Sequence, residues 1–300
     1  MKILMTGASG FIGRHLLLVL ANQGEANTVF AVVRHIPNDA HPAVNWIVAD
    51  LGISDWTKNL PAEDFDVIIH LAQSKRYREF PSQAIDIFNI NVRATFELAE
   101  WALKNHVRHF LFASTGNVYG SKDGVHHEED CCNPESMYGA SKLSAEILLK
   151  PFSEFMNILV LRFFGVYGPG QTDAMLPGII QRFNAGDEIA LAENVGVKFN
   201  PIYVDDCVSA INLLTATPAL TSHEVLNVGG TEIIDLRQAS ELLEKIGGKR
   251  AAIRITPDCP KQLVGSTEKL REQYGFSERI PFHEGLRLTF NAFKKSSETQ

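Results

Sequence analysis

The chain has 300 residues, 45% of them hydrophobic and 21% charged, which is typical of a soluble globular protein long enough to bury a large core. The 28 lysines and arginines against 35 aspartates and glutamates give a net charge of −7, which argues against nucleic acid and anionic membranes as partners. Four cysteines, two of them adjacent, are too few for a secreted disulfide scaffold. Because no charged leader precedes the first predicted strand and no stretch reaches the roughly 18 apolar residues of a membrane span, we expect a cytoplasmic protein.

Short apolar and β-branched runs alternate with segments of helical period in the first half of the chain. Strands are predicted at residues 3–6, 29–33, 46–49, 67–71, 110–113 and 158–163, with helices beginning near residues 11, 54, 84, 91 and 137. This alternation predicts an α/β fold with a doubly wound parallel sheet covered by helices on both faces. From Gly165 onward glycine, proline and asparagine recur between longer irregular stretches, which indicates an additional lobe.

Three glycines lie in the run TGASGFIG, which follows the first predicted strand and leads into a helix. Gly7 would let the chain turn sharply, Gly10 would let backbone N–H groups approach a pyrophosphate, and Gly13 would let the helix pack closely on the strand. Phe11 and Ile12 begin the helix, whose N-terminus attracts an anion. A turn that only joins a strand to a helix is the alternative. The position directly after the first strand favours a dinucleotide site of the Rossmann type.

The end of the second predicted strand indicates which dinucleotide is bound. In this fold a carboxylate at that point binds the ribose of NAD, whereas a cation accepts the 2′-phosphate of NADP. The strand ends at Val33, and the next residue is Arg34, whose planar and permanently charged guanidinium suits a phosphate. We therefore expect NADP, with NAD as the alternative if Arg34 lies in solvent.

A tyrosine and a lysine four residues apart, Tyr138 and Lys142, lie on one face of a predicted helix. A nearby ammonium group would lower the pKa of the phenol and let it move a proton to or from an alcohol oxygen. Thr115 follows the fifth predicted strand, at the edge of the sheet where doubly wound folds bind ligands, and would bond the reacting oxygen. Each feature alone also occurs by chance or in a simple turn. Their combination predicts a proton-transfer site.

Together these motifs resemble the extended short-chain dehydrogenase/reductase family, the NAD-dependent epimerases and dehydratases of nucleotide sugars. The resemblance extends from the first residue to about residue 210. It implies a dinucleotide-binding Rossmann domain at residues 1–164, with return segments near 201–230, and a smaller substrate-binding lobe at 165–200 and 231–300. It also implies a catalytic trio, in which the tyrosine moves the proton and the lysine additionally holds the nicotinamide ribose. The members of this trio are Thr115, Tyr138 and Lys142.

The resemblance further implies contacts to cofactor and substrate. Besides the glycine turn and Arg34, the expected cofactor contacts are Asp50, Leu51, Leu71, Ala72, Lys75, Asn91, Tyr138, Lys142 and Phe164. The expected substrate contacts are Arg76, Thr115, Asn117, Gly165 and Asn200. Relatives commonly pair two helices of the first lobe into a four-helix bundle, so the resemblance also implies a homodimer.

The chain departs from the family pattern at positions that bear on the reaction. Family dehydratases carry Asp-Glu directly after the catalytic threonine, where this chain has Gly116 and Asn117, so 4,6-dehydration is not expected. Gly165 stands where many relatives carry an asparagine for the substrate diphosphate, and the stretch before Tyr203 lacks the usual Arg-Asp. Cations such as Arg76 could supply the missing positive charge.

We expect an NAD(P)-dependent oxidoreductase acting on a sugar carbinol or ketone. Arg34 favours a reductase of a nucleotide-linked 4-keto-deoxysugar, because a reductase draws on NADPH. The alternatives are a nucleotide-sugar epimerase like UDP-glucose 4-epimerase, which recycles a bound NAD, and a non-catalytic NADP-binding sensor, against which the trio argues. Residues 126–132 include histidine, acidic and cysteine side chains, but adjacent residues do not easily converge on one ion, so no metal site is expected.

Overall fold

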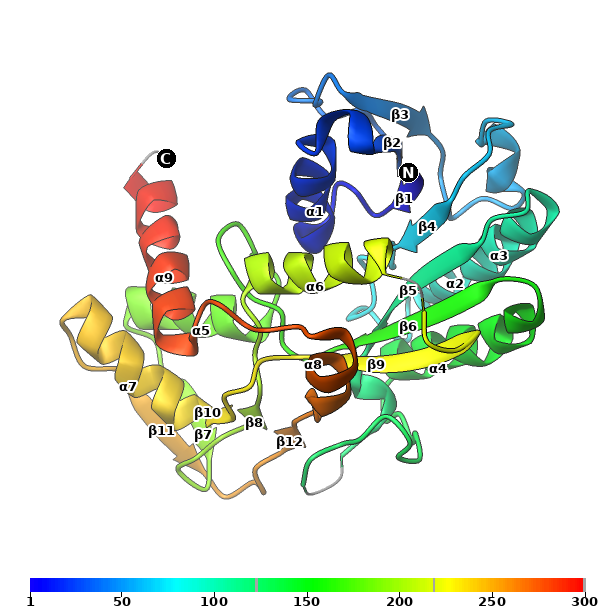
Figure 1. The fold of residues 1–300 in the computed structure, drawn as a ribbon. Helices are drawn as coiled ribbons and strands as arrows, with labels where there is room; N and C mark the ends of the chain where they lie inside the picture. Colours follow the sequence, from blue (N-terminus) through cyan, green and yellow to red (C-terminus); the bar gives the residue numbers. More distant parts are fainter. Residues whose placement is uncertain (122–123, 218, 299–300) are drawn as a thin grey trace. The chain divides into compact units, whose positions relative to one another are not determined.

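A seven-stranded sheet with the strand order β3-β2-β1-β4-β5-β6-β9 forms the framework of the fold (Figure 1). The computed structural model describes residues 1–121, 124–217 and 219–298. The strands of this sheet are β1 (Lys2–Thr6), β2 (Thr28–Val33), β3 (Val44–Val48), β4 (Val67–His70), β5 (His109–Thr115), β6 (Asn157–Phe163) and β9 (His223–Val228). The first six are the strands predicted from the sequence, displaced at their ends by two residues or fewer.

Neighbouring strands at the centre of the sheet run parallel. β1 pairs in parallel with β2 and β4, and the pairs β2–β3 and β4–β5 are parallel as well. Parallel strands covered on both faces read as continuous apolar runs, as in β4, whose four residues are all buried. The carboxyl ends of these strands therefore meet at one edge, where Thr6 pairs in register with His70 and where Thr115 ends β5. The doubly wound α/β fold predicted from the sequence is confirmed.

Helices cover both faces of this sheet (Figure 1). α3 (Ala94–Lys104) and α4 (Met137–Leu149) lie on one face, and α1 (Phe11–Ala21) lies on the other face with the later part of α6 (Val204–Ala216). The core between the sheet and α3 and α4 includes the buried side chains of Leu98, Phe110 and Phe112. The packing of these helices fixes the positions of the loops that follow the strands.

The two helices predicted near residues 84 and 91 are parts of one continuous helical segment. α2 (Ala84–Phe88) leads into a π-helical turn, η3 (Asn89–Arg93), and then into α3. A π turn inserts an extra residue into a helix and commonly occurs at functional sites. This turn includes Asn91, which is fully buried.

The helix predicted near residue 54 does not form. Only a short 3-10 helix, η2 (Trp56–Asn59), follows β3. Asp55 precedes it in the left-handed region with φ 59°, and Pro61 follows closely, so a longer helix is blocked at both ends. The buried Trp56 instead anchors this segment in the core.

The chain divides into two compact units. Unit 1 comprises residues 1–120, 130–162 and 208–226, and unit 2 comprises residues 121–129, 163–207 and 227–300. Unit 2 thus takes in residues 121–129, which the sequence analysis assigned to the dinucleotide-binding domain. The segment that returns to unit 1 begins at residue 208, whereas the sequence analysis expected it near residue 201.

Unit 2 is built from two small sheets and several helices. One sheet has the strand order β10-β8-β12, and the other pairs β11 with β7. Asp235 caps α7 by accepting from the Gln238 backbone N–H, and Gln238 in turn accepts from the Asp235 backbone. The elements of this unit are α5 (Met175–Ala185), β7 (Ile189–Ala192), β8 (Lys198–Phe199), β10 (Ile234–Asp235), α7 (Leu236–Gly247), β11 (Ile253–Thr256), β12 (Gln262–Leu263), α8 (Glu268–Tyr274) and α9 (Phe282–Glu298).

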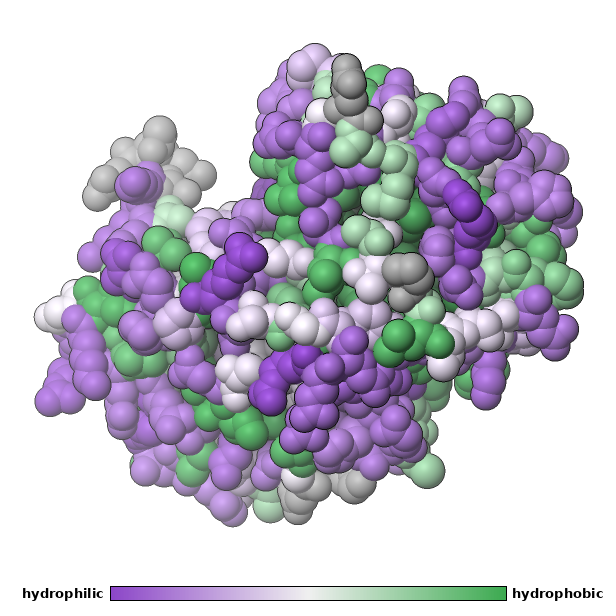
Figure 2. All heavy atoms as spheres, in the orientation of Figure 1, coloured by the Kyte–Doolittle hydropathy of each residue, from purple (hydrophilic) through white to green (hydrophobic). Residues whose placement is uncertain are grey.

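The surface of the protein is mostly polar on the face shown in Figure 2, where hydrophilic residues surround smaller hydrophobic areas. Several large apolar side chains are nevertheless exposed, among them Ile85, Phe88 and Ile147 of unit 1. Among the helices that the structure describes, none combines the length and the apolar character that crossing a membrane requires.

Candidate active site

The glycine turn between β1 and α1 has the geometry that a dinucleotide needs. Gly7 has φ 74°, and a Cβ on it would lie 2.7 Å from the backbone nitrogen of Ala72. A Cβ on Gly13 would overlap the carbonyl oxygen of Gly7. Gly10 is the N-cap of α1 and brings no side chain to cap the N–H groups of the first turn, which begins at Phe11. A turn without side chains before such a helix N-terminus fits a pyrophosphate.

The residues expected to hold the adenosine half of the cofactor lie after β2 and β3. Arg34 directly follows β2 and is exposed, which leaves both the NADP expectation and the solvent alternative open. Asp50 follows β3, and its Oδ1 accepts from the backbone N–H of Gly52 at 2.9 Å. Leu51 is buried beside it. The second carboxylate oxygen of Asp50 therefore remains for a ligand.

The loop after β4 begins with Leu71 and Ala72, both half-buried. The backbone N–H of Leu71 donates to the carbonyl oxygen of Thr6, so the loop stays close to the glycine turn. Lys75 and Arg76 are exposed further along, and the Arg76 guanidinium donates to Gln83 at 2.8 Å. Lys75 as a cofactor contact and Arg76 as a substrate contact both stay predictions.

His70, at the end of β4, is fully buried and bonded at both ring nitrogens. Nδ1 lies 2.6 Å from Thr6 Oγ1, and Nε2 lies 2.8 Å from Thr95 Oγ1. Thr95 donates its hydrogen to the carbonyl of Asn91, so it accepts from Nε2–H, and Thr6 donates to Nδ1. Burial, with a smaller contribution from the charge of Lys142, lowers the pKa of His70 to about 3. The ring is therefore neutral and fixed in one tautomer.

Asn91, an expected cofactor contact, instead connects two parts of unit 1. Its Oδ1 accepts from the Ser74 backbone N–H at 2.8 Å, and its Nδ2 donates to Ser141 Oγ at 2.9 Å. Ser141 in turn donates to the carbonyl oxygen of Tyr138. The fully buried side chain thus links the loop after β4 to the first turn of α4, and its contact with a cofactor stays a prediction.

The phenol oxygen of Tyr138 lies between two polar side chains. Its hydroxyl donates to Gln73 Oε1 at 2.8 Å, and it is also hydrogen-bonded to Thr115. The ring of Tyr77 packs against the ring of Tyr138 with centroids 4.9 Å apart. Ser136 caps α4 by accepting from the third N–H of the helix, which fixes where the helix begins and thereby where Tyr138 lies. Thr115 and Tyr138 are brought together as the sequence predicted.

Burial raises the pKa of Tyr138 well above its usual range, the hydrogen bond from Thr115 lowers it by less, and Tyr77 raises it further. The side chain as a whole is half-buried. The expected depression of this pKa by Lys142 is therefore not observed. The phenol is a hydrogen donor in this structure.

Lys142 is almost fully buried and donates to the carbonyl oxygen of Ala113 at 2.7 Å. Its ammonium also lies 4.8 Å from the centre of the Phe112 ring, a cation–π distance. Burial lowers the pKa of Lys142 to about 7, although the carboxylate of Glu146 opposes this shift. One bond to Ala113 uses one of three ammonium hydrogens, so two hydrogens remain for a ligand hydroxyl.

A buried ion pair supports the strands and the helix that position the trio. Arg162 Nη2 lies 2.7 Å from Glu146 Oε2, with both side chains 6% exposed. Ser114 donates to the other carboxylate oxygen of Glu146, and the ring of Tyr119 lies 4.7 Å from the Arg162 guanidinium. Burial alone would lower the pKa of Arg162, but the hydrogen bond and charge of Glu146 raise it. The pair fixes α4 to β5 and β6.

Asn117, expected to bind substrate, contacts Thr115 instead. Its backbone N–H and its Nδ2 lie 3.2 Å and 3.1 Å from Thr115 Oγ1, and both donate to that oxygen. Since Thr115 accepts twice, its own hydrogen is available for the oxygen of Tyr138. Asn117 therefore orients the threonine. Its exposed side chain leaves a further contact to substrate as a prediction.

Two residues of unit 2 expected at the site have structural roles. Asn200 is 2% exposed, and its amide donates to the carbonyls of Gly230 and Gly265 and accepts from the Gly265 N–H. Its side chain therefore bonds to the backbone, and its contact with a substrate stays a prediction. Phe164 is fully buried, and its ring touches Gly265, where a Cβ would overlap it. The cofactor contact of this residue likewise stays a prediction. Gly165 is exposed with φ 62° and stays a predicted substrate contact.

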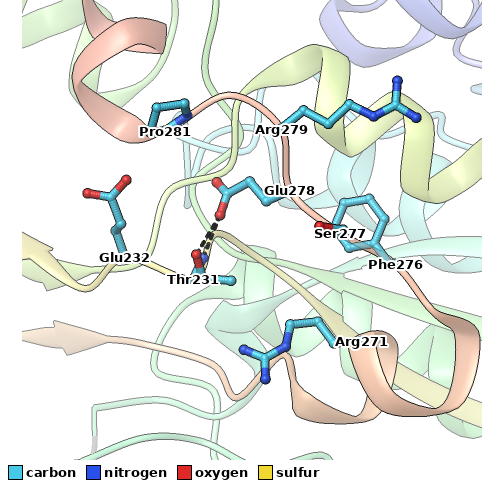
Figure 3. Close-up of a pocket in the computed structure, with 8 residues that line it drawn as sticks. All are labelled: Thr231, Glu232, Arg271, Phe276, Ser277, Glu278, Arg279 and Pro281. Carbon is cyan, nitrogen blue, oxygen red and sulfur yellow. Dashed lines mark hydrogen bonds between the residues drawn. The ribbon is translucent and has the colours of Figure 1, made fainter.

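A pocket of about 380 Å³ lies in unit 2 and includes none of the predicted site residues (Figure 3). Glu278 on its wall accepts from both the backbone N–H and the hydroxyl of Thr231, at 2.9 and 2.8 Å. Glu232 accepts from the backbone N–H of Phe282. These carboxylates connect the loop before β10 to the segment around the start of α9. Within residues 1–121, 124–217 and 219–298, no group of three metal-binding side chains converges.

Sequence reasoning did not single out Gln73 or Tyr77. Both lie in the loop after β4, and both reach Tyr138 through space rather than along one helix. A contact between two residues that are distant in sequence produces no characteristic spacing, so no sequence pattern identifies either residue. Continuous apolar strands and helical spacing, by contrast, are local signals and placed Thr115 and Tyr138.

A Rossmann sheet with an open glycine turn, and a phenol held by a threonine beside a buried lysine, define an enzyme of the extended short-chain dehydrogenase/reductase class. The chain belongs to the NAD dependent epimerase/dehydratase family, whose model matches residues 3–229.

Individual relatives span nearly the whole chain. An uncharacterized UDP-glucose epimerase of Bacillus subtilis is 30% identical, with 95% of this chain and 96% of the relative covered. A probable UDP-glucuronate 4-epimerase of Rhizobium meliloti is 26% identical, with 95% of each chain covered. The crystal structure of UDP-glucuronic acid 4-epimerase from Bacillus cereus in complex with UDP-glucuronic acid and NAD is 28% identical, with a TM-score of 0.86, and covers 99% of this chain and 100% of its own.

Proposed function

We propose that the protein is an NAD-dependent nucleotide-sugar epimerase that inverts C4 of a UDP-linked hexose or hexuronate. The observation that carries the proposal is the hydroxyl of Tyr138, hydrogen-bonded to Thr115 and Gln73, in a chain whose nearly full-length relatives are named as epimerases of UDP-glucose and UDP-glucuronate. These relatives support the epimerase, which was the alternative in the sequence analysis, more than the 4-keto reductase.

Tyr138 would move the proton in both halves of the reaction. The sugar hydroxyl gives its proton to the Tyr138 oxygen when the carbon is oxidised, and the same oxygen returns the proton when the carbon is reduced. Thr115, whose hydrogen is available, stabilises the phenolate that exists before proton uptake. NAD, when bound, would supply the hydride acceptor and donor at that carbon.

Lys142 would hold the nicotinamide ribose and supply positive charge to the phenolate. It lies one helical turn after Tyr138, and its ammonium has two hydrogens beyond the one given to Ala113. Because the pKa of Lys142 is about 7, both of its protonation states occur near neutral pH, and a negatively charged group that binds nearby favours the protonated form. The glycine turn with Gly7, Gly10 and Gly13 would hold the pyrophosphate, and the open oxygen of Asp50 the adenosine.

We propose NAD rather than NADP as the cofactor. The solved relative from Bacillus cereus contains NAD, and an epimerase retains one cofactor through oxidation and reduction. Arg34 is exposed after β2, and this position is compatible with either dinucleotide. Mass spectrometry of the small molecules that the purified protein releases on denaturation identifies the cofactor directly. Release of NADP would contradict this choice.

Conversion assays with UDP-glucose, UDP-galactose, UDP-glucuronate and UDP-galacturonate test the function. We expect interconversion of one C4 pair, followed by chromatography, without net change in the absorbance of reduced nicotinamide. Tyr138→Phe should abolish conversion while NAD stays bound, and Tyr203→Phe, which also removes one phenol oxygen from a buried ring, should not. Stoichiometric loss of NADPH with a 4-keto sugar would favour the reductase instead.

We also propose a homodimer through the helices α2, α3 and α4 of unit 1. α4 contacts both α2 and α3, and the rings of Phe96 and Phe152 meet with centroids 5.8 Å apart. The large apolar side chains that these three helices expose are Ile85, Phe88, Phe96, Ile147 and Leu148. Exposed apolar residues gathered on one set of helices are typical of a surface that a partner covers. A second copy of this chain is the occupant that the family resemblance implies.

A further inference from the structure

The hydrogen bond between Tyr138 and Gln73 fixes where the phenol hydrogen points. Thr115 Oγ1 accepts from Asn117 twice, so its single hydrogen goes to the oxygen of Tyr138. The phenol has one hydrogen of its own, and that hydrogen goes to Gln73 Oε1 at 2.8 Å. The Tyr138 oxygen therefore accepts from Thr115 and donates to Gln73 at the same time.

An amide group can serve the phenol in both of its protonation states. The carbonyl oxygen of Gln73 accepts from a neutral phenol, and its NH₂ group donates to a phenolate after a half turn of the amide. The amide neither gains nor loses a proton in this exchange, so the proton that Tyr138 takes up comes from the sugar hydroxyl alone. Gln73 is exposed, and rotation of its amide is therefore not blocked by core packing.

We propose that Gln73 is a positioning residue for Tyr138, which aims the phenol hydrogen through its carbonyl oxygen and supports the phenolate through its NH₂ group. The inference rests on the proposed function, because it takes Tyr138 as the residue that moves the proton. Its geometric basis, the contact between the two side chains, does not depend on the identity of the sugar.

The backbone around Gln73 is held by its neighbours rather than by its own side chain. The Ala72 N–H donates to Thr6 Oγ1 at 3.3 Å, and the Ser74 N–H donates to Asn91 Oδ1 at 2.8 Å. Ser74 is also buried, whereas Gln73 is exposed. Substitutions at position 73 should therefore leave the loop and the fold in place, which makes the residue suitable for testing.

A titration that needs no substrate tests the inference. Tyr138 is replaced by 3,5-difluorotyrosine, whose more acidic phenol ionises in an accessible pH range, and its ionisation is followed by absorbance in Gln73→Leu and Gln73→Glu. Leucine removes both the acceptor for the neutral phenol and the NH₂ donor to the phenolate. Because the hydrogen bond to the charged phenolate is the stronger of the two, we expect a pKa higher by about half to one unit. Glutamate also adds a like charge beside the phenolate, so we expect a larger rise in pKa. Gln23→Leu, a surface change after α1, should leave the pKa unchanged.

A rise of the phenol pKa in both variants, larger in Gln73→Glu, supports the inference. An unchanged or lower pKa in Gln73→Leu would overturn it, because the phenolate would then gain nothing from the NH₂ group. In the active enzyme we expect Gln73→Leu to lower kcat with little change in KM and to move the pH profile of kcat in the same direction as the titration. Retention of full activity by Tyr138→Phe would contradict the proposed function and leave the titration result standing on its own.

Discussion

His70 joins the ends of two neighbouring strands, because its Nδ1 accepts a hydrogen bond from Thr6 Oγ1 at 2.6 Å. The backbone N–H of Ala72 donates to the same threonine oxygen, and His70 Nε2–H donates to Thr95, which donates to the carbonyl of Asn91. These hydrogen bonds form a series in which every donor faces the same direction, from the loop after β4 to the π turn η3. The ends of β1 and β4 and the π turn η3 are thus held by one ordered network.

We expect substitution of His70 to reduce the loss of stability in acid. The pKa of His70 is lowered to about 3 in the folded protein, while the unfolded chain has a value near the ordinary 6.5. As the pH falls through this window, the unfolded state binds a proton that the folded state does not, so the free energy of unfolding falls by on the order of 1 kcal/mol per pH unit.

Urea unfolding of wild type and of His70→Gln between pH 6.5 and pH 4 measures this effect. Glutamine offers an acceptor and a donor but does not titrate, so its slope should be the smaller one. His35→Gln, a change at an exposed histidine, serves as the control and should keep the wild-type slope. Equal slopes in His70→Gln and wild type would contradict the buried neutral ring.

Lys142 should make stability depend on pH above neutrality, whereas His70 does so in acid. Burial lowers its pKa from 10.5 to about 7 in the folded protein. Between these values the unfolded chain holds the proton more tightly, so stability rises with pH through the window and is lost as the pH falls toward 7. Lys142→Met should flatten this rise, as followed by urea unfolding at pH 7.5 and pH 9. Lys142→Met should also abolish conversion of the sugar. An equal rise of stability with pH in wild type and in Lys142→Met would contradict the lowered pKa of Lys142.

The buried pair of Glu146 and Arg162 should show strong coupling. Removing one partner leaves a buried charge unpaired, so Glu146→Gln and Arg162→Met should each lower the free energy of unfolding by about 3–5 kcal/mol. The double variant Glu146→Gln with Arg162→Met should lose less than the sum of the two. Denaturant unfolding of the four proteins in this double-mutant cycle measures the coupling. Additive losses would show that the two side chains do not act as a pair.

The sequence predicted the framework of the fold because its signals are local. Each of the six predicted strands is mostly apolar, and such runs identify buried parallel strands without knowledge of their neighbours. The sequence also predicts the glycine turn, because three glycines at fixed spacing between a strand and a helix form a local pattern, and Gly13 packs against Gly7 within that unit. The helix predicted near residue 54 is wrong, because no sequence pattern indicates the left-handed backbone conformation of Asp55.

The buried partners of Asn91 and Asn200 could not be predicted from the sequence, for one physical reason. Whether an amide faces a ligand or the protein backbone depends on residues that are distant in sequence. Asn200 is satisfied by backbone groups of Gly230 and Gly265, and Asn91 by Ser74 and Ser141. None of these partners is predictable from the local pattern around either asparagine.

Glycine substitutions distinguish the cofactor turn from an ordinary helix glycine. Gly13→Ala would place a Cβ on the carbonyl oxygen of Gly7, so the helix must move away from the turn and binding of the dinucleotide should be lost. Gly178→Ala, within α5, meets open space and should raise stability by up to about 1 kcal/mol. Tryptophan fluorescence quenching by NADH and thermal unfolding measure the two effects. Unaltered binding by Gly13→Ala would contradict the proposed cofactor site.

The proposed dimer can be tested with one exposed isoleucine in each unit. Ile147 of α4 is 63% exposed, and Ile255 of β11 is 61% exposed, so glutamate at either position is tolerated by the folded monomer. At a covered helix surface, however, each protomer would bury a carboxylate in the interface, and its desolvation would be costly. Light scattering coupled to size exclusion should give a dimer for wild type and for Ile255→Glu, and a monomer for Ile147→Glu. A monomeric wild type would exclude the proposed interface, and a dimeric Ile147→Glu would place it away from α4.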